Sequence, residues 1–204
     1  MILYESIGPN PRVVSMFLAE KGMEVERRAI DIMSGENRQD AYKRIHPGGT
    51  TPALVLDDGT TLSETVAICE YLEEKQPQPP LIGTTPEERA RTRMWARRID
   101  LTVAEPMTTG FRGAEGRPMF EPRMRVVSAT TAPDLKEIAA DGLAWIDGQL
   151  GGREWIAGDR FTLADILLFS FVEFGALVGQ PLRDDLHKLA AWRARVASRP
   201  SAQG

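Results

Sequence analysis

Residues 1–75 combine short apolar runs with helical spacing, which predicts a mixed α/β unit. Ile2–Tyr4 is a short apolar run typical of a strand, and Val25–Ile32 predicts a second strand that Arg27-Arg28 makes less regular. Gly22 marks the end of the helix expected between these two strands. The apolar side of that helix is made of Val13, Val14, Phe17 and Leu18.

A hairpin is the most regular pattern in this part of the chain. Ala53–Leu56 is a short apolar run, Asp57–Gly59 carries turn residues, and Thr60–Leu62 resumes an extended segment. A short helix is expected before it, near Asn37–Ile45. Together with the helix that follows the hairpin, the predicted order is β-α-β-α-β-β-α, which is the thioredoxin-like pattern.

The helix after the hairpin is expected to begin directly from the strand. Ser63 is the predicted N-cap, with Glu64 and Thr65 in the first turn. The start of a helix presents unpaired backbone N–H groups and the positive end of its dipole. This position therefore suits a small carboxylate ligand.

A proline-rich connector divides the chain. Gln76–Pro80 cannot continue a helix and reads as an extended linker. We expect a thioredoxin-like domain over residues 1–76, a linker over 77–86 and an all-helical bundle over 87–204. The helix that begins at Pro86 is expected to kink or break near Pro106 and Gly110.

The second informative stretch lies in the helical part. Thr162 and Asp165 have the spacing of a capping box, with Asp in place of Glu or Gln. The residues that follow, Ile166–Val172, are apolar nearly all round and predict a helix at the centre of a bundle. We interpret the polar pair as a cap that holds the fold.

Composition narrows the function classes. The chain has 204 residues, of which 42% are hydrophobic and 26% charged, and its formal net charge of −4 gives no reason to expect nucleic-acid binding. A single cysteine, Cys69, suits a reducing compartment and is expected to be buried. His46 and His187 make no metal motif. With neither a membrane-length apolar run nor a signal-peptide pattern, we expect a cytoplasmic protein that contacts no membrane.

Two motifs together resemble the cytosolic glutathione transferases. One is the Thr51-Pro52 pair before the hairpin, followed by Glu64-Thr65, and the other is Gly158–Asp165. The resemblance implies a cis proline, pairing of the Thr51 backbone with the cysteinyl part of glutathione, and binding of the γ-glutamyl part by Glu64 and Thr65. It also implies a homodimer in the glutathione transferase fold.

The loop after the first strand is the candidate for activating the thiol. Asn10 is a candidate N-cap with Pro11 at the first helical position, and its amide can donate to a thiolate. Gly8 stands where serine-type transferases carry their hydroxyl, and the loop looks more like the Nu-type glutathione proteins. The catalytic candidates are therefore Asn10 first and Ser6 second; the alternative is that Asn10 is only a cap. Tyr4 is expected in the core.

The glycyl carboxylate of glutathione needs a donor from the segment before Pro52. By resemblance this role falls on Asn37, with Arg38 or Gln39 as alternatives, and a plain solvated position is the other interpretation of these residues. Thr50 replaces a lysine common in the family, which removes one expected contact.

The resemblance implies a glutathione S-transferase that holds glutathione as a thiolate for attack on a small hydrophobic electrophile, a detoxification reaction. Two alternatives stay open: a glutathione-dependent disulfide reductase or peroxidase of Nu-like type, and a non-catalytic binding or regulatory module. Glutathione is the only cosubstrate expected, without a metal. Four side chains suggest either an apolar electrophile pocket or a bundle core: Met107, Phe111, Met119 and Phe120.

Overall fold

The structure is a computed structural model that describes residues 1–203. The chain divides into two compact units, Met1–Leu81 and Ile82–Gln203. The division falls within the residues 77–86 that were expected to form a linker, while the predicted limits of the two domains stay a prediction. Each unit is described by itself.

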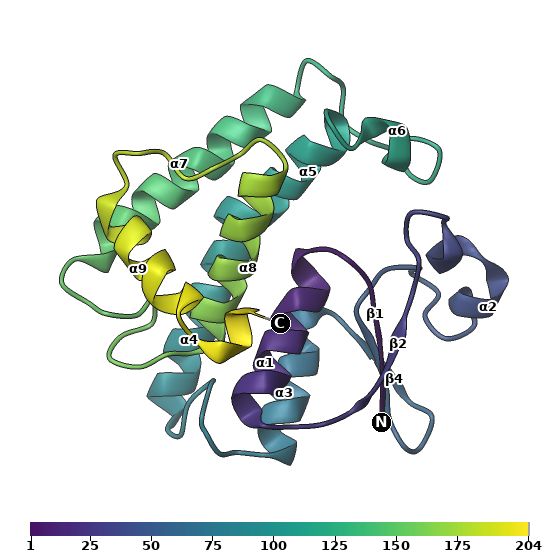
Figure 1. Ribbon diagram of the computed structural model, residues 1–204, viewed down its shortest axis with the longest axis horizontal. Helices are drawn as coiled ribbons and strands as arrows, with labels where there is room; N and C mark the ends of the chain where they lie inside the picture. Colours follow the sequence, from purple (N-terminus) through teal and green to yellow (C-terminus); the bar gives the residue numbers. More distant parts are fainter. Residues whose placement is uncertain (204) are drawn as a thin grey trace. The chain divides into compact units, whose positions relative to one another are not determined.

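The N-terminal unit is built on a four-stranded mixed sheet (Figure 1). The spatial order is β2-β1-β3-β4; β1 pairs with β2 in parallel, and both remaining pairs are antiparallel. The parallel pair needs a crossover, which a helix supplies, whereas the last pair is joined by the predicted tight turn. The strands are β1 (Ile2–Glu5), β2 (Glu26–Ala29), β3 (Ala53–Val55) and β4 (Thr61–Ser63).

Helices cover both faces of this sheet. The long helices α1 (Pro9–Lys21) and α3 (Thr65–Lys75) pack against each other on one side, and α2 (Asp40–Lys43) lies on the other (Figure 1). The short helix predicted near Asn37–Ile45 is present as α2, but it begins later than expected. The segment contains a 3₁₀ turn, Glu36–Arg38, and then α2, because Gln39 between them has an extended backbone (φ −76°, ψ 154°).

The alternation of side chains along β1 separates two apolar cores. Leu3 is fully buried on the side of α1 and α3, where the apolar side of α1 is also buried. Tyr4 points to the opposite side and joins a small cluster with Ile30, Tyr42 and Ala53. The second cluster seats α2 against the sheet and so fixes the chain that leads into β3.

The C-terminal unit is helical throughout its regular elements. Where a kink or break was expected near Pro106, the first helix passes into α5 through a π-helical segment, Asp100–Ala104. A π turn changes the hydrogen-bond spacing and so accommodates a proline that lacks an N–H. The helices are α4 (Pro86–Ile99), α5 (Glu105–Gly113), α6 (Arg117–Phe120), α7 (Ala132–Leu150), α8 (Leu163–Leu177), α9 (His187–Ala197) and a 3₁₀ turn at Pro200–Gln203.

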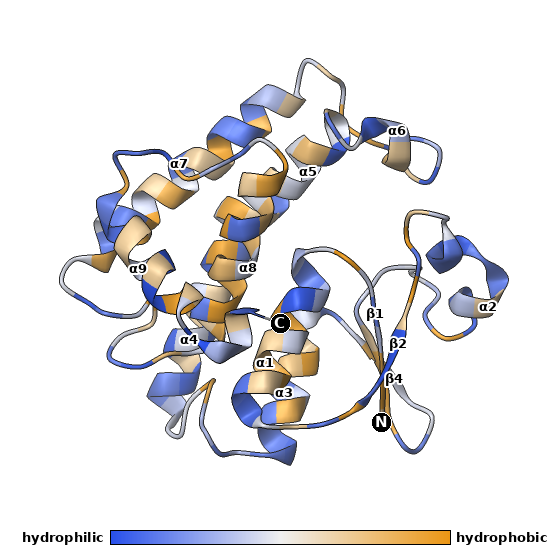
Figure 2. Cartoon of the chain, viewed as in Figure 1, coloured by the Kyte–Doolittle hydropathy of each residue, from blue (hydrophilic) through white to orange (hydrophobic). Residues whose placement is uncertain are grey.

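The predicted capping box opens the buried helix α8, much of which is coloured as apolar in Figure 2. Thr162 and Asp165 bond each other's backbone, and Asp165 also accepts hydrogen bonds from the Ile156 N–H and the Trp192 indole, both at 2.9 Å. Burial raises the pKa of Asp165 to about 6, although these hydrogen bonds favour its charged form. The motif is therefore structural, as the sequence indicated.

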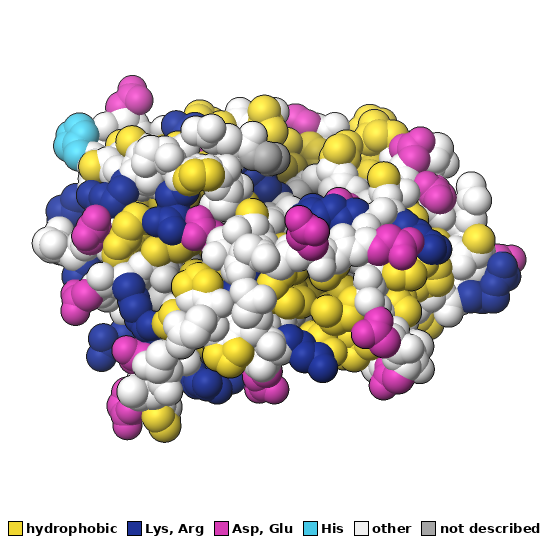
Figure 3. Space-filling model, turned by 60° about the horizontal axis from the view of Figure 1, so that its bottom comes forward, with side chains coloured by type: hydrophobic (Ala, Val, Ile, Leu, Met, Phe, Trp, Pro, Cys, Tyr) yellow, Lys and Arg dark blue, Asp and Glu magenta, His cyan; other side chains and the backbone are white. Residues whose placement is uncertain are grey.

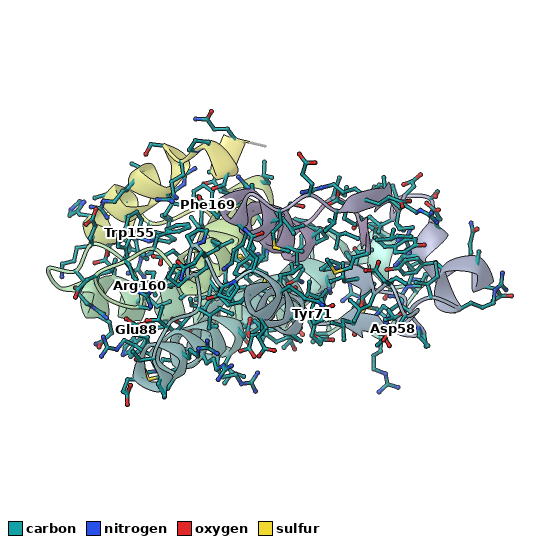
Figure 4. The ribbon with its side chains drawn as sticks, turned by 90° about the horizontal axis from the view of Figure 1, so that it is seen from below. Asp58, Tyr71, Glu88, Trp155, Arg160 and Phe169 are labelled. Atoms are coloured by element: carbon teal, nitrogen blue, oxygen red, sulfur yellow. The ribbon has the colours of Figure 1, made fainter. Side chains whose placement is uncertain are left out.

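A second capping box opens α4. Thr85 and Glu88 bond each other's backbone, and the Glu88 carboxylate lies 2.8 Å from the Arg160 guanidinium (Figure 4). Hydrogen bonds from Thr84, followed by smaller contributions that include Arg160, lower the pKa of Glu88 to about 2. This carboxylate thus ties the start of α4 to the loop before α8.

Acidic and basic side chains are interspersed on the face shown in Figure 3. Within residues 1–203, no helix combines the length and the apolar character needed to cross a membrane.

Candidate active site

Helix α3 begins abruptly at the end of β4. Ser63 is still in the strand, so the prediction that it is the N-cap was wrong; Glu64 occupies that position. Glu64 has φ 69°, the one positive φ at a non-glycine residue in the described chain. This backbone turn converts strand to helix without a spare residue. No side chain caps α3, so the N–H groups of its first turn stay available to a ligand.

Helix α1 begins two residues earlier than its sequence suggested. Gly8 is the N-cap, with φ 133°, and Pro9 takes the first helical position, so the prediction that Asn10 is the N-cap was wrong. A proline at the first position loses nothing, because that N–H has no intrahelical acceptor. The Asn10 side chain is thereby released from capping its own helix.

Asn10 instead bonds the other helix. The Thr65 hydroxyl donates to Asn10 Oδ1 at 3.1 Å, which brings the first turns of α1 and α3 side by side. The Asn10 Nδ2 group has no hydrogen-bond partner within residues 1–203. Since Oδ1 is already used as an acceptor, the amide presents its donor side to any ligand at this point.

Ser6 lies beside the proline turn. Its Oγ is 2.5 Å from Thr51 Oγ1, and the Thr51–Pro52 peptide bond is cis, as the family resemblance implied. The loop after β1 and the segment before β3 are therefore joined by a short hydroxyl pair. Ser6 is held by this contact, whereas Asn10 keeps an uncommitted donor.

Asn37 and Arg38 occupy different roles in the geometry. Asn37 is buried and its Nδ2 donates to the Gly49 carbonyl at 2.7 Å, while its Oδ1 has no partner in the described chain. One of the two Asn37 amide N–H groups is thus used inside the protein, and the side chain is only 7% exposed, which leaves little of it for the glycyl end of glutathione. Arg38 is half-buried, and its Nε has no partner within the same residues.

One residue near this site was missed by sequence reasoning. The Tyr42 hydroxyl donates to the Thr50 carbonyl at 2.6 Å, one residue before Thr51. Burial, with a smaller contribution from Tyr4, raises the pKa of Tyr42 to about 12. A single aromatic residue in the polar segment 36–46 was the available signal, because it had to be buried somewhere.

Two residues that were expected to be structural are confirmed as such. Cys69 is fully buried, and burial, with smaller contributions from Glu73 and Glu70, raises its thiol pKa well above the ordinary value. Tyr4 is buried in the core, with its hydroxyl accepting from Arg28. Neither can act as a nucleophile or activator at the two helix starts.

The apolar cluster predicted in the C-terminal unit has a mixed outcome. Met107 is buried in the helical core. Phe111 is half-buried and makes edge contacts with Phe120, at a centroid distance of 6.1 Å, and with Phe174, at 5.3 Å. Met107 is therefore a core residue. For Phe111, Met119 and Phe120, which are half-buried, both interpretations stay open.

The N-terminal unit therefore places two uncapped or glycine-capped helix starts and an amide donor side by side, and it carries the half-buried Arg38 in the segment before β3. Backbone N–H groups and dipoles of this kind bind carboxylates and stabilise a thiolate. A βαβαββα unit followed by a helical unit is the fold that the resemblance to glutathione transferases implied, and these helix starts suit a ligand such as glutathione.

Comparison with known proteins agrees with this class. Residues 7–75 match the family model of the glutathione S-transferase N-terminal domain, and residues 115–200 match that of the C-terminal domain. The chain belongs to the cytosolic glutathione S-transferase superfamily, and the predicted family and fold are confirmed.

Similar proteins span nearly the whole chain. Glutathione S-transferase 2 of Saccharomyces cerevisiae is 32% identical over 207 residues, covering 100% of this chain and 88% of that protein. Glutathione S-transferase GstA of Escherichia coli O157:H7 is 32% identical over 189 residues, covering 91% and 87%. The crystal structure of Gtt2 from Saccharomyces cerevisiae has a TM-score of 0.92 at 32% identity, covering 100% of this chain and 99% of that one.

These relatives confirm the predicted function as a glutathione S-transferase. They do not favour the disulfide reductase or peroxidase, nor the regulatory module. Which residues bind and activate glutathione stays a prediction.

Proposed function

We propose that glutathione lies along the N-terminal unit, with its γ-glutamyl end at the start of α3 and its thiol at the start of α1. The observation that carries this proposal is the hydrogen bond from Thr65 to Asn10, which joins the two helix starts. Glu64 carries an exposed carboxylate for the γ-glutamyl ammonium, and the free N–H groups beside Thr65 suit the carboxylate at the same end.

Asn10 is the proposed catalytic residue. A free thiol has a pKa of about 8.5, and full ionisation near neutral pH needs a drop of about two units, or roughly 2.7 kcal/mol. Asn10 Nδ2 supplies a hydrogen bond that only the anion fully uses, and the α1 dipole adds to it. Ser6 remains the second candidate, but its hydroxyl is already paired with Thr51.

Arg38 is the proposed partner of the glycyl carboxylate. Its guanidinium can make the two parallel hydrogen bonds that a carboxylate accepts. The neighbouring Asn37 uses its amide on the Gly49 carbonyl and so acts inside the protein. Thr51 and Pro52 present the backbone on which the cysteinyl part lies.

In the reaction, the glutathione sulfur donates an electron pair to the electrophilic carbon and forms a C–S bond. The leaving group departs with its bonding pair, and the thiol proton goes to solvent. A small hydrophobic electrophile is the proposed second substrate, and detoxification is the proposed role.

A cytoplasmic homodimer is the proposed working form. Leu101 and Trp145 are 54% and 42% exposed, although both are large apolar residues, and the segments that carry them pack together in the C-terminal unit. Burial of these two side chains against a second copy of the chain would remove apolar surface from water. Equilibrium sedimentation at micromolar concentration is expected to give twice the chain mass. The single free thiol of Cys69 fits a reducing compartment.

Calorimetry with glutathione, followed by two parallel assays, tests the proposal. We expect saturable binding of glutathione at millimolar concentration or below, and turnover of an aryl halide that exceeds turnover of a mixed disulfide. Absence of binding would contradict the proposed site. Binding with turnover of the disulfide alone would replace conjugation by reduction.

A further inference from the structure

The chain immediately before Pro52 is held at two consecutive carbonyls by buried side chains. Asn37 donates to the Gly49 carbonyl at 2.7 Å, and Tyr42 donates to the Thr50 carbonyl at 2.6 Å. This segment precedes β3 and has no strand ladder to fix it. Side chains from the 3₁₀ turn and from α2 therefore supply the hydrogen bonds that a neighbouring strand would supply in a sheet.

Both donors are rigid. Tyr42 is 3% exposed and Asn37 is 7% exposed, so neither side chain can turn to water. The Tyr42 ring packs in the cluster with Tyr4 and Ala53. Since burial also raises the pKa of Tyr42 to about 12, the hydroxyl keeps its proton over the whole working pH range.

We propose that Tyr42, assisted by Asn37, is a positioning residue for glutathione: by holding the Thr50 carbonyl it aims the Thr51 N–H at the substrate. The peptide unit is planar, so the direction of the Thr50 C=O fixes the direction of the Thr51 N–H on the other side of the same plane. The inference rests on the proposed function, in which the Thr51 backbone pairs with the cysteinyl part.

The packing of the Tyr42 ring does not depend on its hydroxyl, so the two roles can be tested separately. A phenylalanine at position 42 would fill the same apolar cluster but leave the Thr50 carbonyl without its donor. The expected consequence is a Thr51 peptide that samples several orientations, of which one binds glutathione. Substrate and transition state would lose this contact equally.

The test compares Tyr42→Phe with the matched control Tyr71→Phe. The Tyr71 hydroxyl makes no hydrogen bond in the described structure, and its ring lies on α3 beside Lys75. For Tyr42→Phe, we expect the Kd of glutathione from calorimetry, and the KM, to rise roughly three- to ten-fold with kcat within about two-fold of the parent. The Kd of γ-glutamylcysteine, which has the same cysteinyl backbone, should rise by the same factor. Tyr71→Phe should change none of these values.

Two outcomes would overturn the proposal. If Tyr42→Phe lowers the melting temperature but leaves the Kd of glutathione unchanged, Tyr42 is only structural, while the proposed function stands. If the parent protein itself fails to bind glutathione, the proposed function and this inference fall together.

Discussion

Thr65 donates a hydrogen bond to the side-chain oxygen of Asn10 at 3.1 Å, between residues 55 positions apart in sequence. One hydroxyl thus holds the amide of the residue proposed to stabilise the thiolate. The same hydroxyl lies in the first turn of α3, where the γ-glutamyl end is proposed to bind. In the proposed site, this single contact therefore joins the recognition of glutathione to the activation of its thiol.

Thr65→Val replaces this hydroxyl with a methyl group of similar size. We expect kcat to fall about ten-fold, because the Asn10 amide loses the bond that orients it, and KM for glutathione to rise. Thr65→Ser keeps the hydroxyl and should stay within about two-fold of the parent. Steady-state kinetics on both variants decide the matter, and a valine variant as active as the serine one would refute the coupling.

Arg38→Gln should weaken the binding of glutathione but not that of γ-glutamylcysteine, which lacks the glycyl residue. We expect KM for glutathione to rise about ten-fold, as for the loss of a hydrogen-bonded charge pair, with kcat unchanged. Arg44→Gln, on an exposed residue just after α2, serves as the control. Equal losses for both thiols would move the glycyl site away from Arg38.

Glu88 should make stability depend on pH at the acid end. Its folded pKa of about 2 lies below the ordinary 4.5, so the carboxylate stabilises the fold above pH 4.5 and this contribution is lost as pH falls toward 2. Glu88→Gln should therefore lower the melting temperature at pH 7, with the gap between variant and parent closing toward pH 2. Glu87→Gln, in the same helical turn, is the control. A gap that stays constant down to pH 3 would exclude this role.

A buried ion pair locks the end of the N-terminal unit. Lys21 pairs with Glu73, both nearly inaccessible, and donates to the carbonyls of Gln76 and Pro79 at 2.8 and 2.6 Å. Lys21→Met removes the buried cation that faces the Glu73 carboxylate, so we expect a loss of about 3–5 kcal/mol in the free energy of unfolding measured in urea.

The double variant Lys21→Met/Glu73→Leu is the comparison. It removes both buried ionisable groups and should be more stable than Lys21→Met alone, because no buried carboxylate is left without its countercharge. If Lys21→Met is as stable as the parent, the ion pair of Lys21 and Glu73 does not contribute to stability in this way.

Features set by neighbouring residues could be predicted from the sequence. The capping box of Thr162 and Asp165 lies within four positions, and the order of strands and helices follows from hydrophobic periods. The first residues of α1 and α3 were harder to predict. Glu64 has a positive φ, which a glutamate rarely adopts. Tertiary structure imposes this conformation, and no local sequence pattern indicates it.

Contacts between distant residues could not be predicted at all. The bond between Thr65 and Asn10, the buried pair of Lys21 and Glu73, and the hold of Tyr42 on Thr50 each depend on how folded elements meet. The family resemblance supplied the candidate residues, and the structure shows which of their donors are already used.

The thiol pKa of bound glutathione is the sharpest test of whether Asn10 stabilises the thiolate. A pH titration of thiolate ultraviolet absorbance, with glutathione bound to the parent protein and to Asn10→Ala, gives the thiol pKa in each. We expect a pKa of about 6.5 in the parent, and a rise of about one to two units in Asn10→Ala with a ten- to hundred-fold lower kcat near neutral pH. A bound thiol that titrates near 8.5 in the parent, or at the same pH in both proteins, would contradict it.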